Sequence, residues 1–127
     1  MNSIHCSGIL FKKASSFLLR DRQVELKRAF GKVLGWFRIE QGYTQEDFSI
    51  VSSRTYVSSL ERGVYSPTLE KLDDIASVIR VHPITLLVGA YALKEHCTVQ
   101  DVLNIIQSDI ESLDLESGIH DMLERNL

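Results

Sequence analysis

Residues 44–63 read TQEDFSIVSSRTYVSSLERG, a pattern that predicts two short helices with almost no chain between them. Thr44 and Asp47 have the three-residue spacing of a capping box, which favours a helix start at Thr44. Ser52 and Ser53 interrupt the pattern, and either serine can cap the helix that follows. The segment therefore predicts a helix, a very short turn, and a second helix that ends at the final glycine.

The second of these helices carries polar residues that a buried helix would not need. The residues predicted to face the core are Phe48, Val51, Val57 and Leu60. The residues predicted to face outward from the second helix are Arg54, Thr55, Ser58 and Ser59. Two short helices, of which the second exposes small and polar groups at its start, are typical of a helix-turn-helix motif.

Apolar residues recur at helical spacing on both sides of this segment. Three- and four-residue steps predict a long helix over residues 22–41 that ends at Gly42. Thr68 can cap a further helix, and Pro83 fits the first position of the next one. The residues of these two helices predicted to face the core are Leu69, Leu72, Ile75, Ala76 and Ile79, then Ile84, Leu87, Val88 and Tyr91. We therefore predict an all-α fold in which five helices over residues 22–93 share one core.

The chain after residue 93 forms a separate helical extension, residues 94–127. Thr98 and Asp101 repeat the capping-box spacing before an amphipathic helix, and a last short helix follows. The apolar stripe of the amphipathic helix consists of Val102, Ile105, Ile106, Ile110 and Leu113. This stripe is more apolar than a loosely attached tail needs. It either forms a dimer contact or packs back on the core of its own chain, and both interpretations stay open.

The charges divide the chain in the same way. The net charge is −3, but residues 1–93 carry 12 Lys and Arg against 9 Asp and Glu, whereas residues 94–127 carry 2 against 8. Only the mildly basic part has to meet phosphate groups if the protein binds nucleic acid. The acidic extension fits a surface that faces away from DNA or that receives a basic partner protein.

Several classes of function find no support in the sequence. It has no Gly-rich phosphate loop, no metal-ligand set and no nucleophile–base spacing, so we expect no enzyme, metal or cofactor. Cys6 and Cys97 lie far apart without a CxxC spacing, which predicts reduced thiols in a cytoplasmic protein. Residues 1–21 lack the long apolar core of a signal peptide, and no stretch approaches the roughly 20 apolar residues of a membrane span. This N-terminal extension is either a short amphipathic helix or an arm that packs on a partner.

The stretch YTQEDF…SSRTYVSSLERGVYSPTLEKLDDIASVI resembles the Cro/repressor-type helix-turn-helix family, also called the XRE or lambda repressor-like family. The matching pieces are Thr44-Gln45-Glu46, Tyr56-Val57-Ser58, Leu60-Glu61-Arg62-Gly63, Pro67-Thr68-Leu69, and Leu72 with Ile75-Ala76. The resemblance covers about residues 24–93. One departure is the spacing, because the segment from Gln45 to Glu61 is about two residues shorter than is usual in the family. The first helix of the motif is therefore expected to end early, or to meet the second at an altered angle.

The resemblance implies that the second helix of the motif is a recognition helix. The implied base-reading residues are Arg54, Thr55, Ser58 and Ser59. Arg54 can bond guanine O6 and N7 together, and Thr55 can donate to a base or contact a thymine methyl group. The implied DNA-backbone contacts are Gln45, Ser53, Tyr56, Arg62, Tyr65 and Thr68. Without the family context, the same side chains would be interpreted as an ordinary exposed face.

The resemblance also implies an ion pair between Arg38 and Glu61 that holds the recognition helix at one angle. Proteins of this kind bind as two-fold dimers on half-sites about 34 Å apart. The candidate dimerisation residues are Leu87, Tyr91, Val102, Ile105, Ile106 and Ile110.

The expected function is that of a sequence-specific transcription regulator, such as a repressor, of bacterial or phage origin. It would act in the cytoplasm as a homodimer on an inverted-repeat operator, and would be nucleoid-associated when bound. Two other roles stay open. One is an antitoxin-like autoregulator that also binds a partner protein through an extension, and the other is an interaction adaptor that no longer binds DNA.

Overall fold

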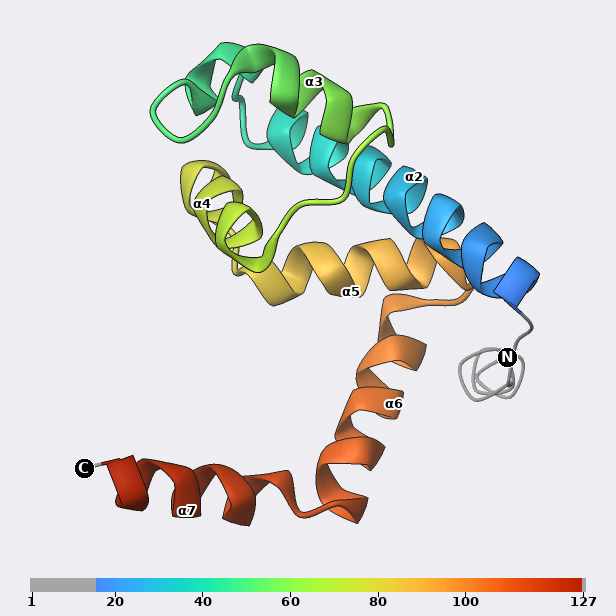
Figure 1. Ribbon diagram of the computed structural model, residues 1–127, viewed down its shortest axis with the longest axis vertical. Helices are drawn as coiled ribbons and strands as arrows, with labels where there is room; N and C mark the ends of the chain where they lie inside the picture. The colour runs from blue at the N-terminus through green and yellow to red at the C-terminus, as the bar shows by residue number, and fades with distance from the viewer. Residues whose placement is uncertain (1–15, 127) are drawn as a thin grey trace.

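The computed structural model describes residues 16–126, with side chains from residue 25 onward, and every element in this part of the chain is a helix (Figure 1). The elements are α2 (Ser16–Glu40), the 3-10 helix η1 (Gln45–Phe48), α3 (Arg54–Glu61), α4 (Leu69–Ile79), α5 (Pro83–Lys94), α6 (Val99–Ser112) and α7 (Leu115–Asn126). The predicted all-α fold class is confirmed.

The long helix α2 begins earlier than its sequence pattern indicated. A start at residue 22 was expected, but α2 already runs from Ser16, since neither proline nor glycine interrupts residues 16–30. Its end agrees with the prediction: Gly42 has a φ of 82°, and its N–H donates to the Ile39 carbonyl at 3.0 Å. Residues 16–21 therefore belong to α2, and the interpretations of residues 1–15, including Cys6, lie outside the described residues.

The core lies between α2, α3, α4 and α5, and η1 closes one side of it (Figure 1). Its buried side chains are Phe30, Leu34, Phe48, Val57, Leu60, Leu72, Ile75, Ala76, Ile79, Leu86 and Ala90. Gly89 allows α5 to approach α2, because a Cβ atom there would lie 2.9 Å from Cγ1 of Val33. These contacts hold the helix-turn-helix segment against a rigid support.

Three residues that were predicted to face the core are exposed instead, namely Leu69, Ile84 and Tyr91. Leu69 and Ile84 lie in the first turns of α4 and α5. Helix α5 turns Leu86 and Ala90 toward the core, while of the predicted residues Leu87 packs against that core and Val88 is buried against α6. The prediction failed because α5 is apolar on almost every side, so that periodicity alone could not identify its buried face.

The first helix of the motif is shortened to the single 3-10 turn η1, as the reduced spacing suggested. After η1 the chain continues in turns, and the N–H groups of Val51 and Ser52 both donate to the Phe48 carbonyl, at 2.9 and 2.8 Å. Phe48 itself is fully buried. From α4, Lys71 Nζ donates to the Val51 carbonyl at 2.5 Å. The expected early end of this helix is confirmed, and a lysine supplies a donor that a further helical turn would otherwise provide.

Helices α6 and α7 together form an extension that leaves the core, named here the C-terminal arm (Figure 1). The predicted capping box is present at its start: the Asp101 N–H donates to Thr98 Oγ1 at 3.0 Å, and the Thr98 N–H donates to Asp101 Oδ2 at 3.1 Å. Helix α6 packs on α5 through Val102, which is buried against Val88 and Ala92. Helix α7 contains no buried residue. The arm is thus attached to the body mainly through one side of α6.

None of the described helices is by itself long and apolar enough to cross a membrane. Helices α4 and α5 reach that length and composition only as a pair, and this pair is bent by 102°. Both helices contribute side chains to the core of the body.

Candidate nucleic-acid interface

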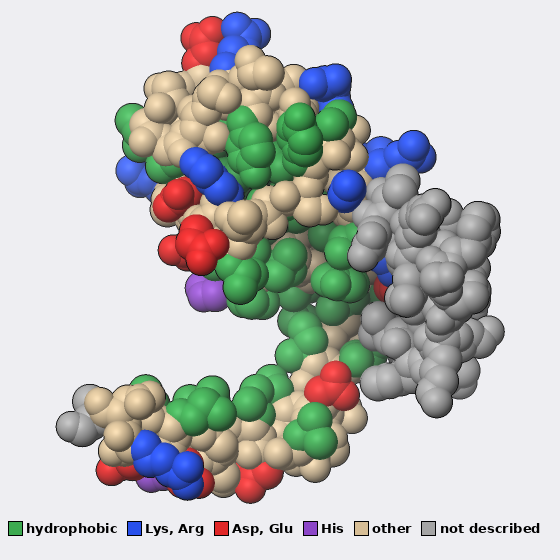
Figure 2. All heavy atoms as spheres, viewed as in Figure 1, with side chains coloured by type: hydrophobic (Ala, Val, Ile, Leu, Met, Phe, Trp, Pro, Cys, Tyr) green, Lys and Arg blue, Asp and Glu red, His purple; other side chains and the backbone are tan. Residues whose placement is uncertain are grey.

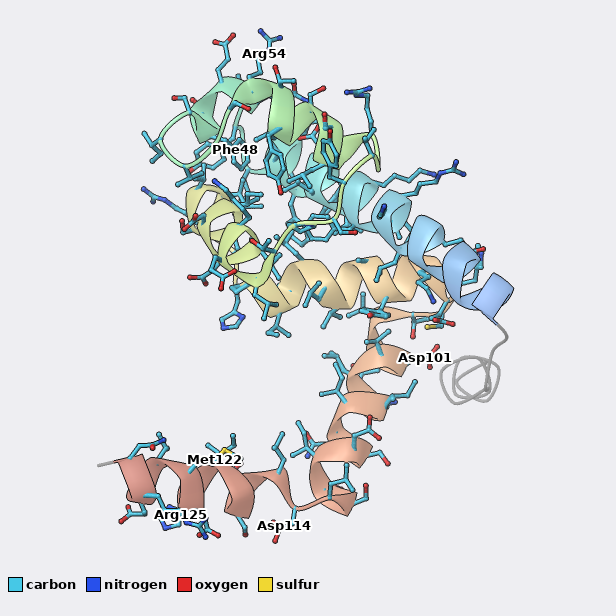
Figure 3. All side chains as sticks on the ribbon, viewed as in Figure 1. Phe48, Arg54, Asp101, Asp114, Met122 and Arg125 are labelled. Carbon is cyan, nitrogen blue, oxygen red and sulfur yellow. The ribbon has the colours of Figure 1, made fainter. Side chains whose placement is uncertain are left out.

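Helix α3 lies at the edge of the body that is remote from the C-terminal arm (Figure 1). Ser53 caps it, since its Oγ accepts a hydrogen bond from the Tyr56 N–H at 3.1 Å. The first two residues of the helix, Arg54 and Thr55, are exposed, and Arg54 points away from the body (Figure 3). The start of α3 therefore presents two polar side chains and a positive helix end to solvent.

One carboxylate, that of Glu61, ties α3 both to α2 and to η1. Arg38 Nε and Nη2 donate to Oε2 and Oε1 of Glu61 at 2.6 and 2.9 Å, and Arg38 Nη1 donates to the Tyr43 carbonyl at 3.1 Å. Gln45 Nε2 donates to the same Oε1 of Glu61 at 3.2 Å. The Arg38 and Glu61 side chains are only 15% and 12% exposed. The implied ion pair is thus present, and Gln45 is an additional partner that the sequence did not indicate.

The positively charged member of this ion pair is Arg38, whose guanidinium group is bound to α3 through Glu61. The hydrogen bonds that Arg38 donates to Glu61 raise the pKa of the Arg38 guanidinium above its ordinary value, although burial acts in the opposite direction. An arginine stays charged at every physiological pH. A shielded ion pair adds little net stability, but removal of one partner destabilises the fold strongly, because the other charge is left unpaired. Its structural role is to fix the angle of α3 on α2.

Two glycines of α2 let α3 come close. A Cβ atom at Gly31 would lie 2.4 Å from the Leu60 carbonyl oxygen and 2.6 Å from that of Glu61, while one at Gly35 would lie 3.2 Å from Glu61 Oε1. No larger residue fits at Gly31 unless α3 moves. Neither position was predicted from the sequence. The available signal was a pair of glycines four residues apart, hence on one face, within an otherwise regular helical pattern.

The exposed arginine of α3 already has a partner in the protein without DNA. Arg54 Nη1 donates to Glu46 Oε1 at 3.0 Å, which links α3 to η1 across the motif. The two side chains are 67% and 73% exposed, so the pair is weak and solvent-screened. This pair was not predicted from the sequence. The pair uses one N–H of Arg54, and its guanidinium group keeps further donors for other acceptors.

The two adjacent serines of α3 face different ways. Ser58 is half-buried and lies four residues after Arg54, hence on the same side of the helix. Ser59 lies about 100° further round, is only 6% exposed, and its Oγ accepts a hydrogen bond from Arg62 Nη2 at 3.3 Å. The prediction that Ser59 faces outward to contact bases is therefore wrong. Ser59 instead orients the otherwise exposed Arg62 at the end of α3.

The other candidate DNA-backbone residues follow α3 or cap a helix. The rings of Tyr56 and Tyr65 stack with their centroids 6.1 Å apart, and Tyr56 also packs on the core. Thr68 caps α4, since its Oγ1 accepts a hydrogen bond from the Lys71 N–H at 3.2 Å. The hydroxyl groups of Thr68 and Ser53 act as acceptors in their caps, so each keeps its own O–H as a donor.

An open, mostly polar hollow of about 400 Å³ lies beside the start of α3. It is lined by Arg38, Thr44, Gln45, Glu46 and Arg54. The guanidinium groups of Arg38 and Arg54 both border this hollow, and each is paired with a carboxylate, that of Glu61 or Glu46. Among the residues that the structure describes, no three His, Cys, Asp or Glu side chains are placed to hold a metal ion.

Comparison with known protein families gives a match to the helix-turn-helix family over residues 34–86. The matched segment runs from the middle of α2 into the first turn of α5 and includes η1, α3 and α4. Neither a curated protein nor a solved structure matched the chain. The match supports the resemblance of residues 34–86 to the Cro/repressor-type (XRE) helix-turn-helix family of DNA-binding transcription regulators.

Proposed function

We propose that the protein regulates transcription by binding one operator sequence, as a dimer on an inverted repeat. The observation that carries this proposal is the setting of α3. Its leading face is exposed, and Glu61 fixes the angle of the helix by bonding both Arg38 and Gln45. A helix held in this way can enter the major groove with its first residues at the base edges.

Sequence is read by Arg54, Thr55 and Ser58. The Arg54 guanidinium bonds O6 and N7 of a guanine after it leaves Glu46, and Thr55 bonds a base or contacts a thymine methyl group. Ser58 is short and lies on the same side, so the helix can approach the floor of the groove. Each bidentate pair with a base contributes about 1–3 kcal/mol of discrimination.

The DNA backbone is held on both sides of this helix. Gln45 donates one amide hydrogen to Glu61 and keeps the second for a phosphate oxygen. Tyr65 and Arg62 are exposed at the end of α3 and in the loop that follows. The remaining backbone contacts of the proposal are Ser53, Tyr56 and Thr68. Such contacts set the register of the protein on the duplex but carry no sequence information.

A dimer supplies the specificity that one helix lacks. A single recognition helix meets only a few base pairs, which is too little against the many competing sites of a genome. Two copies related by a two-fold axis place their recognition helices about 34 Å apart, one turn of the duplex. Occupancy of a promoter by this dimer then excludes or recruits RNA polymerase. The site of action is the cytoplasm, where the chromosome of a bacterium lies.

Selection of bound sites from a random pool of duplex DNA tests the proposal. The full chain is expected to enrich an inverted repeat whose half-sites lie about ten base pairs apart, centre to centre. Affinity for the enriched sequence is expected to fall steeply with added salt, because phosphate contacts release counterions.

A matched control distinguishes base recognition by Arg54 from the general effect of removing one positive charge. The variant Arg54→Ala is expected to lose enrichment at one position in each half-site, whereas Arg80→Ala, an exposed arginine at the end of α4, leaves the selected sequence unchanged. No enriched sequence with the full chain would contradict the proposal and favour the role of an interaction adaptor. The shortened η1 is the observation that favours this second role.

A further inference from the structure

The body and the C-terminal arm enclose an apolar groove of about 290 Å³ between α5 and α6. Its apolar walls include Ile84, Leu87 and Tyr91 from α5, and Val102, Ile105 and Ile106 from α6. Five of the six residues named from the sequence as dimerisation candidates thus line one groove, and Ile110 is the exception. Figure 2 shows a hollow between the body and α7, bordered by hydrophobic side chains.

Helix α7 carries a second apolar surface that nothing in the described chain covers. Its stripe consists of Leu115, Ile119, Met122 and Leu123, which are 43–58% exposed. At 100° per residue these side chains span about 100° of the helix, which is wide enough to contact two neighbouring helices. In Figure 3, Met122 points toward the space in front of α5. Figure 2 shows hydrophobic side chains on the sides of α5, α6 and α7 that border this space.

The space between α5 and α7, named here the arm channel, has the width of one helix. Helix α6 separates its two walls and has 14 residues, which makes it about 21 Å long. Packed helices lie about 8–10 Å apart, so a helix between two others requires their axes to be about 16–20 Å apart. The arm channel is therefore too wide to close by itself and wide enough to accept one further helix.

We propose that α7 of a second copy of this chain fills the arm channel, and that the exchange is reciprocal. The apolar stripe of each α7 then lies against α6 and α7 of the other copy. Four helices stack in the dimer, in the order α5 of the first copy, α7 of the second copy, α7 of the first copy and α5 of the second copy. This inference rests on the proposed dimer and identifies its contact surface.

A second copy is favoured over a basic partner protein because one arrangement covers both uncovered surfaces. The α5–α6 groove and the α7 stripe belong to the same chain, so a two-fold axis pairs each with the other and closes the assembly. One groove alone is small, whereas a stable interface buries about 800 Å² per partner. A reciprocal exchange doubles the contact and adds the meeting of the two α7 stripes.

The acidic charge of the two arms gives this dimer a characteristic dependence on salt concentration. Residues 94–127 carry 2 basic against 8 acidic residues, so two arms repel each other while their apolar surfaces attract. The repulsion between exposed charges is screened by salt. Dimerisation through the arms is therefore expected to strengthen as salt is added, which is opposite to the behaviour of DNA binding. A basic partner helix in the same channel would weaken with salt.

The test is the molar mass of the full chain in solution, measured by analytical ultracentrifugation over a range of concentrations. The wild-type chain is expected to form a dimer. The variants Ile119→Lys in α7 and Ile106→Glu in α6 are each expected to weaken the dimer by about 100-fold or more, because they place a charge in its apolar centre. Ser117→Lys and Asn104→Glu add the same charges at exposed positions on the opposite sides of these helices and are expected to leave the dimer intact.

Mixing the two monomeric variants tests the exchange itself. In an equimolar mixture, an Ile106→Glu chain contributes a normal α7 and an Ile119→Lys chain contributes a normal groove. One wild-type contact is then restored and the other gains an opposite-charge pair, so a mixed dimer is expected. Circular dichroism confirms that each variant keeps its helical content.

Three results would overturn the proposal: a monomeric wild-type chain, single variants that stay dimeric, or a mixture that stays monomeric. The first would leave the arm channel to residues 1–15 or to another protein. The proposed function is judged separately. A dimer that selects no DNA counts against DNA reading alone, and a chain that binds an inverted repeat after Ile119→Lys with unchanged affinity counts against the arm exchange alone.

Discussion

The body and the C-terminal arm are both made of regular, well-capped helices, but they differ in what covers their apolar side chains. In the body, Phe48, Leu60 and Ile75 are fully buried by other parts of the same chain. In the arm, Val102 alone among the described residues reaches comparable burial, and Ile119 of α7 remains 43% exposed. Helix caps and apolar periodicity thus favour a helix, but the helix becomes part of the core only where other elements cover its apolar side. The body holds α3 through contacts within the same chain, whereas the apolar side chains of the arm stay largely uncovered.

The largest expected difference between the two regions is the loss of stability when one large side chain is removed from each. Phe48→Ala is expected to lower the free energy of unfolding by about 3–5 kcal/mol, because it leaves a cavity under η1. Ile119→Ala, in α7, is expected to change it by less than about 1 kcal/mol at dilutions where the chain is monomeric. Urea denaturation of both variants measures the difference. Equal losses would show that the arm is part of the cooperative core.

The next largest effect concerns the link that sets the angle of α3. Glu61→Ala is expected to cost about 2–4 kcal/mol of stability and to weaken operator binding as well, since it leaves Arg38 shielded without its carboxylate and Gln45 without its acceptor. The matched control is Glu46→Ala, which removes a carboxylate from an exposed pair and is expected to cost less than about 1 kcal/mol. Thermal unfolding compares the two, and a similar drop in Tm for both would contradict the account.

A smaller loss is expected where α4 supports the shortened motif. Lys71→Met keeps most of the side-chain length but removes the donor to the Val51 carbonyl, at an expected cost of about 1–2 kcal/mol. Amide hydrogen exchange in residues 49–52 is expected to accelerate more than exchange elsewhere in the body. Glu70→Gln, at the exposed neighbouring position, provides the control. Uniform acceleration in both variants would argue that the lysine has no local role.

The smallest expected effect is a gain of function. Glu46→Ala releases Arg54 from its exposed pair, so binding to the selected operator is expected to tighten by up to about fivefold at low salt. The gain is expected to fade as salt screens the pair in the wild-type chain. Fluorescence anisotropy with a labelled operator measures both. Weaker binding by this variant would show that Glu46 supports the interface rather than competing for Arg54.

Much of the fold could be predicted from the sequence, because the features that decide it are local. The caps at Ser53, Thr68 and Thr98, and the glycine at the end of α2, act within a few residues of themselves. Most of the buried face of α3 and α4 was predicted for the same reason, with Ser59 and Leu69 as the exceptions. The face of α5 was not, since a helix with apolar residues all round gives no direction.

The candidate site was predicted less completely, because its geometry depends on contacts between distant residues. The pairing of Arg38 with Glu61 came from the family resemblance, but the third partner, Gln45, needs the bend of the chain after α2 to reach the same oxygen. Ser59 was misplaced because outward and inward positions of a two-turn helix differ by a single step of 100°. The close approach at Gly31 depends on where α3 lies, which no local pattern specifies.

The most direct test of the central claim, that α3 reads the operator, is to repeat the DNA selection with the full-length variant Arg54→Gln. Arginine prefers the O6 and N7 of guanine, whereas glutamine matches the N6 and N7 of adenine. The expected result is an inverted repeat with unchanged spacing in which one guanine of each half-site becomes adenine. Enrichment of the original sequence, with the same base at that position, would show that Arg54 does not read it.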